Sequence, residues 1–284
     1  MIGILAPSEW QMTFGERAAI EGMLAQLRPR VAIEIGTAEG GSLQRIAYYS
    51  ERVHSFDIVR PQLPAESLSN VTLHTGDSHV LLPKVLEELA SEGVNVDFAL
   101  VDGDHSADGA ERDLRDLLAS DATRRTVIVL HDSLNDLVRA GFKRIDYAAE
   151  PKVVYADLDF IGGHLSHQGP FHHELWGGLG IVVLDCGGQK PIPPEGDNSR
   201  FYDLFEMLSP VRDALLLREE NGEPVGPGTV AEAIATAREE LERTRGDAVM
   251  ARRWLEELHG SASWRVTAPL RPAKRRLGGR KAQS

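Results

Sequence analysis

Short runs of β-branched and apolar residues recur along the first two thirds of the chain, separated by polar turns and by stretches with helical spacing. Seven such runs are present, at 31–35, 53–57, 71–75, 96–102, 126–131, 152–158 and 180–185. Runs that are apolar throughout are typical of strands buried on both faces, and alternation with helices favours a parallel sheet. The pattern therefore predicts an α/β fold with a doubly wound, mostly parallel seven-stranded sheet.

Apolar residues at helical spacing fill the segments between these runs. They predict helices at 41–50, 79–91 and 108–119, each long enough to cross over the sheet. A further helix is predicted at 12–28, where Thr13 followed by Glu16 forms a capping-box pattern. We expect this leading helix to cover the sheet or the entrance to a site.

Changes in composition divide the chain further. We expect residues 1–30 to form a helical cover and residues 31–186 to form the main domain. Glycine and proline accumulate from 187 to 228 around one helix-like stretch, which indicates a connection. Residues 229–259 predict an exposed C-terminal helix through which copies of the chain could pair. Residues 260–284 predict a basic, disordered tail.

The formal net charge of -12 conceals an uneven distribution. Residues 260–284 contain seven Lys or Arg and no acid, so residues 1–259 carry 24 basic against 43 acidic side chains, or -19. This acidic body argues against nucleic acid as a partner. The tail, which contains Trp264, either contacts an anionic membrane surface peripherally or only keeps the chain soluble.

Other sequence features bear on the compartment. No run approaches the roughly 18 apolar residues that a transmembrane helix needs. Cys186 is the only cysteine, so no internal disulfide can form. No signal-peptide pattern stands at the start of the sequence. We therefore expect a cytoplasmic protein.

A glycine-rich turn follows the first predicted strand. Glycines there let the backbone turn sharply, and the N-terminus of the next helix presents N–H groups to a nucleotide cofactor. The residues concerned are Glu34, Gly36, Thr37, Gly40 and Ser42. The order is E-x-G-x-x-x-G and lacks the paired early glycines of the G-x-G-x-x-G dinucleotide fingerprint, which disfavours a nicotinamide-dependent oxidoreductase without excluding it.

This Rossmann-like segment resembles the first motif of class I S-adenosylmethionine-dependent methyltransferases. Glu34 matches the acidic member of that motif, and Gly36 and Gly40 match its glycines. By this resemblance Asp57, at the end of the second strand, binds the ribose hydroxyls of S-adenosylmethionine. Asp77 and Ser78, which follow the third strand, then lie beside the adenine ring.

Acidic and imidazole side chains follow the fourth and fifth predicted strands. Asp102 and His105 belong to a D-G-D-H sequence, and His131 and Asp132 close the fifth strand. Open α/β sheets bind ligands at this carboxyl edge. Carboxylates favour Mg²⁺ or Ca²⁺, whereas imidazole shifts the preference toward Mn²⁺, Fe²⁺ or Zn²⁺, so spacing alone does not identify a metal.

The D-G-D-H sequence is similar to D-A-D-K of catechol-type O-methyltransferases and closer to D-G-x-H of the macrolide sugar O-methyltransferases and cephalosporin-hydroxylase-like methyltransferases. The resemblance covers residues 13–185. It implies that Asp102, His131 and Asp132 hold Mg²⁺ or another divalent cation, with Asp102 also near the cofactor. It implies that His105 is the general base, for which a ring that is neutral at pH 7 is suited. His131 stands where the relatives usually present a carboxylate, which makes metal dependence conditional.

Less specific interpretations remain for this cluster and for its surroundings. Asp104 could cap the helix that begins near Ser106, with His131 packed in the sheet and only Asp102 and Asp132 facing the site. The His-rich stretch 162–174 lacks zinc-site spacing and is interpreted as a loop over the active site. Trp176 is expected to pack in the core rather than to contact a substrate.

Together these features predict an S-adenosylmethionine-dependent O-methyltransferase that acts on a hydroxyl of a sugar, glycan or other small molecule. The tail resembles the endings of bacterial enzymes that build cell-surface polysaccharides, through Ser263, Trp264, Arg265, Thr267, Pro269, Leu270 and Arg271. Two alternatives stay open: a nicotinamide-dependent oxidoreductase, and a noncatalytic cofactor-binding module of a polysaccharide-assembly complex.

Overall fold

The predicted sheet is present in the computed structural model of the chain, which describes residues 10–61, 69–166, 171–187, 204–226, 228–240, 243, 246 and 250. Its strands are β1 (Val31–Ile35), β2 (Arg52–Asp57), β3 (Val71–Thr75), β4 (Phe98–Val101), β5 (Arg125–His131), β6 (Val153–Ile161) and β9 (Leu179–Asp185). They lie in the order β3-β2-β1-β4-β5-β9-β6, and only β9 runs antiparallel to its neighbours. The prediction of a mostly parallel seven-stranded α/β sheet is confirmed.

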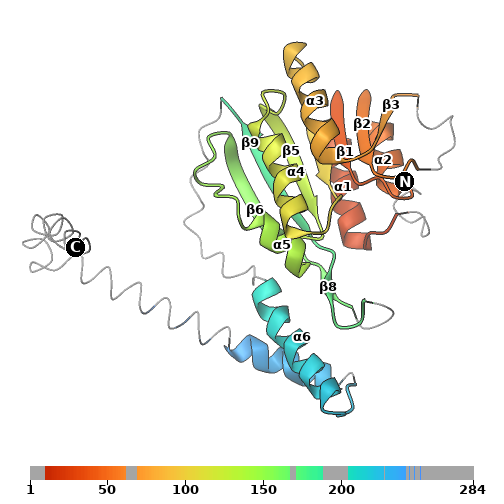
Figure 1. Ribbon diagram of the computed structural model, residues 1–284. Coiled ribbons are helices and arrows are strands. Elements are labelled where there is room, and N and C mark those ends of the chain that lie inside the picture. The colour runs from red at the N-terminus through yellow and green to blue at the C-terminus, as the bar shows by residue number, and fades with distance from the viewer. Residues whose placement is uncertain are drawn as a thin grey trace, which may run out of the picture. The chain divides into compact units, whose positions relative to one another are not determined.

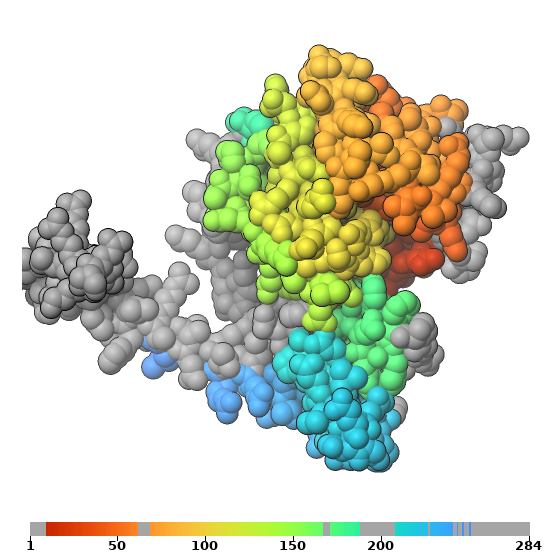
Figure 2. Space-filling model, viewed as in Figure 1, coloured from red at the N-terminus to blue at the C-terminus, as the bar shows by residue number. Residues whose placement is uncertain are grey.

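Helices cover both faces of this sheet (Figure 1). One face packs against α1 (Phe14–Leu27) and α2 (Gly41–Tyr49). The other packs against α3 (Ser78–Ser91), α4 (Ala107–Ala119) and α5 (Asp136–Phe142), and α3 and α4 form a continuous cover in the space-filling view (Figure 2). Each fully buried Leu, Ile or Phe in these layers contributes roughly 1.5–3 kcal/mol, which makes the sheet a rigid base for its loops.

The ends of two helices show how local sequence shapes the site. The capping box on α1 is confirmed, because Thr13 accepts from the Glu16 backbone N–H and the Glu16 carboxylate accepts from that of Thr13. The cap of α4 is Ser106, whose hydroxyl accepts from the Gly109 N–H at 3.0 Å. The alternative that Asp104 caps α4 is therefore wrong. Asp104 instead accepts from the Ser106 N–H at 2.8 Å and shapes the turn before the helix.

Several elements were not anticipated. A two-stranded hairpin, β7 (His164–Leu165) and β8 (Leu175–Trp176), precedes β9, and α5 follows β5 directly. The helix in the Gly- and Pro-rich connection is α6 (Leu204–Glu220). Residues 228–240 are helical, within the predicted C-terminal helix, whereas the basic tail 260–284 lies outside the described residues.

The chain divides into two compact units, residues 1–217 and residues 218–284. Every feature of the candidate site below belongs to the first unit. Among the described residues, no helix is long and apolar enough to cross a membrane.

Candidate active site

The turn after β1 depends on glycine. Gly36 has a φ of 88°, its N–H donates to the Phe56 carbonyl at 2.9 Å, and a Cβ atom there would overlap the carbonyl oxygen of Asp102. Gly40, with a φ of 77°, is the N-cap of α2. Since both positions lie in the left-handed region, the loop can adopt this shape only with glycines there. The backbone of the loop consequently lies directly against the end of β4.

Asp57, the predicted ribose ligand, holds the glycine-rich loop in place. Its Oδ2 accepts from the backbone N–H groups of Thr37 and Ala38, both at 2.8 Å. Its Oδ1 accepts from the Val59 N–H at 2.8 Å. A carboxylate has about four acceptor sites, so Asp57 keeps capacity for a ligand hydroxyl in the adjoining cavity, which it lines.

Glu34 lies beneath the same loop. Its side chain is fully buried and accepts from the hydroxyls of Ser42 at 2.6 Å and Ser55 at 2.7 Å. Burial raises the pKa of Glu34 to about 7, although the two hydroxyl hydrogen bonds oppose this change. Glu34 lines neither cavity of the site, so it supports the loop from below, whereas Ser42 and Thr37 reach the cavity wall.

A cavity of about 500 Å³ opens between the ends of β2, β3 and β4. Asp77 and Ser78, the predicted adenine-side residues, both line it. Asp77 also caps α3 by accepting from the His79 N–H at 2.9 Å. Ser78 donates at 2.9 Å to Asp113, a fully buried carboxyl whose pKa burial raises to about 6. The sequence analysis did not identify Asp113 as the partner of Ser78, because its position in α4 suggests only the surface of a helix.

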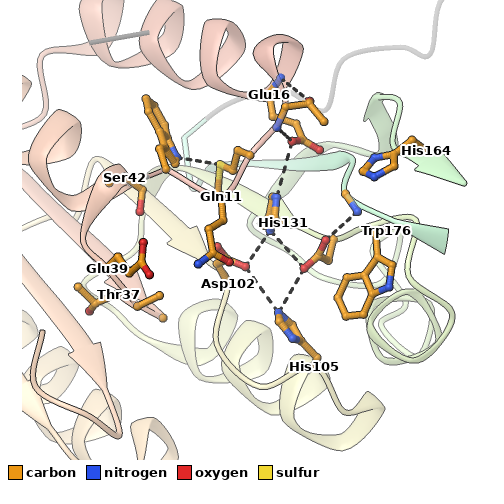
Figure 3. Close-up of a pocket in the computed structure, with 18 of the residues that line it drawn as sticks. Gln11, Glu16, Thr37, Glu39, Ser42, Asp102, His105, His131, His164 and Trp176 are labelled. Atoms are coloured by element: carbon orange, nitrogen blue, oxygen red, sulfur yellow. Dashed lines mark hydrogen bonds and ion pairs between the residues drawn. The ribbon is translucent and has the colours of Figure 1, made fainter. Parts of the chain in front are cut away.

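A carboxylate–imidazole cluster formed by Glu16, Asp102, His105, His131 and Asp132 faces a second cavity of about 590 Å³ (Figure 3). His131 Nδ1 lies 2.8 Å from Asp102 Oδ1 and 3.3 Å from Asp132 Oδ2. His105 Nε2 lies 3.2 Å from Asp132 Oδ2 and 3.8 Å from Asp102 Oδ1. The structure thus brings together the four side chains that the sequence predicted at the ends of β4 and β5. His131 takes part in the cluster, so the alternative in which only the two aspartates face the site is wrong.

The carboxylates determine the charge of both imidazoles. Hydrogen bonds to Asp102 and Asp132 raise the pKa of His105 to about 10. Burial opposes protonation of His131, yet Asp102, Asp132 and Glu16 raise its pKa well above the usual value. Burial likewise opposes ionisation of Asp132, but the two histidines hold its pKa below the usual range. The two carboxylates therefore favour the protonated His105 ring, contrary to the expectation of a ring that is neutral at pH 7.

Glu16 is a site residue that the sequence identified only as a helix cap. Its side chain is 1% exposed, and Oε2 lies 3.9 Å from His131 Nε2. Burial raises the pKa of Glu16, but the hydrogen bond and charge of His131 and the hydrogen bonds of Thr13 outweigh it and lower the pKa to about 2. Glu16 also accepts from the Gly178 N–H. Helix α1 therefore contributes a charge to the cluster.

The turn between β8 and β9 anchors Asp132. Because β9 runs antiparallel to β5, Leu179 pairs with His131 and the preceding glycines lie beside the end of β5. The Gly177 N–H donates to Asp132 Oδ1 at 2.8 Å, and the Leu134 N–H donates to the Gly177 carbonyl at 3.0 Å. Asp132 has a φ of 52°, a conformation that only such surrounding bonds stabilise in a residue with a side chain.

Trp176 lines the second cavity and is only partly buried, so the expectation that it packs in the core is wrong. His164 of the predicted covering loop lines the cavity as well. Within the described residues, ligand atoms of Asp102, His105 and Asp132 lie within 4.8 Å of one another. Two carboxylates and an imidazole fit a divalent cation by type, provided that the imidazole gives up its proton.

The geometry defines an α/β domain with a glycine-rich loop and an adjoining carboxylate–imidazole cluster at the carboxyl edge of its sheet. Residues 33–133 match the family model described as a methyltransferase domain. This match agrees with the resemblance to class I S-adenosylmethionine-dependent methyltransferases and favours that class over the nicotinamide-dependent alternative. No curated protein matches the chain.

Three solved structures illustrate what the chain is similar to. An O-methyltransferase from Bacillus cereus in complex with S-adenosylhomocysteine is 19% identical, with a TM-score of 0.43 over 64% of this chain and 87% of that one. The O-methyltransferase TomG from Streptomyces achromogenes, in complex with S-adenosylmethionine, is 16% identical, with a TM-score of 0.43 over 63% and 83%. The mycinamycin-pathway methyltransferase MycE, in complex with Mg, S-adenosylhomocysteine and mycinamycin VI, is 13% identical, with a TM-score of 0.44 over 69% and 55%.

Proposed function

We propose that the protein is an O-methyltransferase that transfers a methyl group from S-adenosylmethionine to a hydroxyl of a sugar, a glycan or another small molecule. The observation that carries this proposal is the shared cavity of the cofactor loop and the acid–base cluster. Gly36 and Thr37 line the same cavity as Asp102, His105 and Asp132. A methyl donor held by the loop therefore lies beside groups that can take a hydroxyl proton.

The cofactor supplies an activated methyl group on a sulfonium centre. The residues of the loop position it: Gly36 admits the backbone turn, Asp57 fixes the loop and offers an acceptor to ribose, and Ser78 and Asp77 border the adenine side. S-adenosylmethionine held there would supply its methyl carbon to the acceptor oxygen, with S-adenosylhomocysteine as the leaving group. Positioning contributes most of the acceleration for such an in-line displacement.

The hydroxyl proton passes to the carboxylate–imidazole cluster as a unit. Its three carboxylates outnumber its two imidazoles, so one negative charge remains even with both rings protonated. These groups titrate as a coupled unit, so the His105 ring can accept the hydroxyl proton only after it has released the proton that the carboxylates favour. His105, at 48% side-chain exposure, is the most exposed member of the cluster.

A metal-assisted form of the reaction is the second candidate. Asp102 and Asp132 would hold Mg²⁺ or another divalent cation. His131 is the predicted third ligand, and His105 also lies close enough to both aspartates to serve as one. A bound cation would make the acceptor hydroxyl more acidic. Activity that disappears with a chelator and returns with Mg²⁺ would establish this form, whereas chelator-insensitive turnover would exclude it.

Calorimetric titration with S-adenosylmethionine and S-adenosylhomocysteine, with and without Mg²⁺, tests the donor assignment. Stoichiometric binding is expected, and absence of binding in both conditions refutes the proposal. His105→Ala should lower kcat by about 10²-fold or more and leave cofactor affinity unchanged. His164→Ala is the matched control, because His164 lines the same cavity outside the cluster. Full cellular activity of His105→Ala would instead support the noncatalytic module.

Other expectations stay predictions within this proposal. They are a cytoplasmic location, a polysaccharide-related acceptor, peripheral membrane contact through residues 260–284 and pairing of copies through residues 229–259. Light scattering of the full chain would measure the oligomeric state. Sedimentation with anionic against neutral vesicles would measure membrane contact at low and high salt.

A further inference from the structure

One side of the second cavity is an aromatic wall formed by Phe171 and Trp176. The Trp176 ring centre lies 5.5 Å from that of His105, at 78° to its plane. Phe171 lies 5.0 Å from Trp176 at 60°, and both line the cavity. Figure 3 shows Trp176 beside His105, next to the cluster. An acceptor that presents its hydroxyl to His105 is therefore within reach of this wall.

The wall presents an apolar surface. Trp176 Nε1 donates to Glu174 Oε2 at 2.8 Å, which satisfies the polar edge of the indole within the hairpin. Phe171 is 50% exposed at the cavity. Two aromatic rings that remain open beside a catalytic cluster favour a ligand with a flat or weakly polar ring face, which gains by covering them.

The other described residues that line the cavity make it acidic. Its described lining contains the carboxylates of Glu16, Glu39, Asp102 and Asp132, and within that lining no Lys or Arg occurs. Residues 1–9 and 167–170, which adjoin the lining in sequence, contain no Lys or Arg either. Even with two charged imidazoles the carboxylates are in excess. An acceptor bearing a carboxylate or phosphate would meet unbalanced like charge, which costs about tenfold or more in affinity at such distances.

Resting on the proposed methyltransferase function, we infer that the acceptor is an uncharged or cationic ring compound whose hydroxyl faces His105 and whose ring lies against Trp176 and Phe171. Anionic forms of the same ring, such as a uronate or a nucleotide-linked sugar, are poor substrates. The site selects the acceptor by the charge of its ring substituents as well as by shape.

A matched acceptor panel tests the charge rule. It contains a hexoside and a phenol, each in neutral, amino-substituted and carboxylate forms, together with a nucleotide-linked hexose, and follows radiolabelled methyl transfer from S-adenosylmethionine. The expected kcat/KM is at least about tenfold higher for the neutral or amino form than for the carboxylate form of the same ring. A carboxylate or nucleotide-linked form as the best substrate overturns the inference. So does stoichiometric cofactor binding with no panel member methylated, whereas absence of cofactor binding refutes the proposed function itself.

Variants of the wall test the ring contact. Trp176→Leu should raise KM for the best acceptor about tenfold with little change in kcat or cofactor affinity, and Trp176→Phe should restore most of the loss. Tyr155→Leu is the control, because Tyr155 is a 46% exposed aromatic on β6 that lines neither cavity. An unchanged KM in Trp176→Leu, or an equal rise in Tyr155→Leu, would overturn the assignment of the wall.

Discussion

Replacing Glu34 by Gln should change how the stability of the protein depends on pH. Burial raises the pKa of Glu34 from 4.5 to about 7 in the folded protein. Between these values the unfolded chain releases the proton while the folded protein keeps it. The stabilising effect of this protonation is complete below the unfolded pKa and is lost as pH rises through the folded pKa. Gln has nearly the same shape, stays neutral and can still bond Ser42 and Ser55.

The magnitude follows from the two pKa values. At about 1.4 kcal/mol for each tenfold change in proton affinity, the full effect on the unfolding free energy is about 3 kcal/mol. Most of it, about 2–3 kcal/mol, falls between pH 5 and pH 8. Other groups titrate in this range too, including Asp113 with a pKa of about 6. The informative quantity is therefore the difference between Glu34→Gln and the natural protein at each pH.

Urea denaturation at pH 5 and pH 8 measures that difference. The unfolding free energy of Glu34→Gln should gain about 2–3 kcal/mol relative to the natural protein on going from pH 5 to pH 8. Glu39→Gln removes an exposed carboxylate from the same loop and should stay within about 0.5 kcal/mol at both values. A pH-independent difference for Glu34→Gln, within about 0.5 kcal/mol, would refute the idea that a protonated carboxyl supports the loop.

Three further substitutions probe the site. Gly36→Ala places a Cβ against the Asp102 carbonyl, so calorimetry should show loss of cofactor binding, and near-normal affinity would contradict the close approach. Glu16→Gln keeps an acceptor for the Gly178 N–H but removes a negative charge from the cluster, so kcat should fall about tenfold. Thr13→Ala is its control. It removes the side-chain cap of α1 and should lower the unfolding free energy by about 1 kcal/mol while kcat stays unchanged. Gly177→Ala puts a Cβ 2.6 Å from Glu16 Oε1 at a φ of 71°; thermal melting should show about 1–3 kcal/mol of destabilisation, and an unchanged Tm would argue against a rigid turn.

The sequence predicted the features that are determined by residues close together in the chain, namely the strands and the glycine-rich turn. The seven strands of the sheet were recognised because each is a short run rich in β-branched and apolar residues between turns, and the glycine-rich turn because glycine readily adopts the positive φ found at Gly36 and Gly40. Strands β7 and β8 have two residues each, too few to show any periodicity, so the hairpin was interpreted as a loop and Trp176 as a core residue. Trp176 lines the cavity because the hairpin formed by β7 and β8 places it there.

Long-range contacts account for the other differences. Glu16 has a complete local explanation as half of a capping box, and nothing nearby in sequence signals its bond to Gly178, 162 residues away. The pKa of His105 is raised by Asp102, three residues before it in sequence, and by Asp132, which lies on the next strand end. Residue types and strand order place these groups at one edge of the sheet, whereas their protonation states depend on distances of about 3 Å that a pattern does not contain.

The aromatic wall and Glu16 both lie outside the segment that matches the family model. The family match spans residues 33–133 and contains the cofactor loop and four members of the cluster. Phe171 and Trp176 follow that span, and Glu16 precedes it. Under the proposed function, donor chemistry and acceptor choice would be encoded in separate stretches of sequence that meet only in the folded protein. A new acceptor preference could be introduced by exchanging the hairpin while the methyl-donating machinery stays untouched.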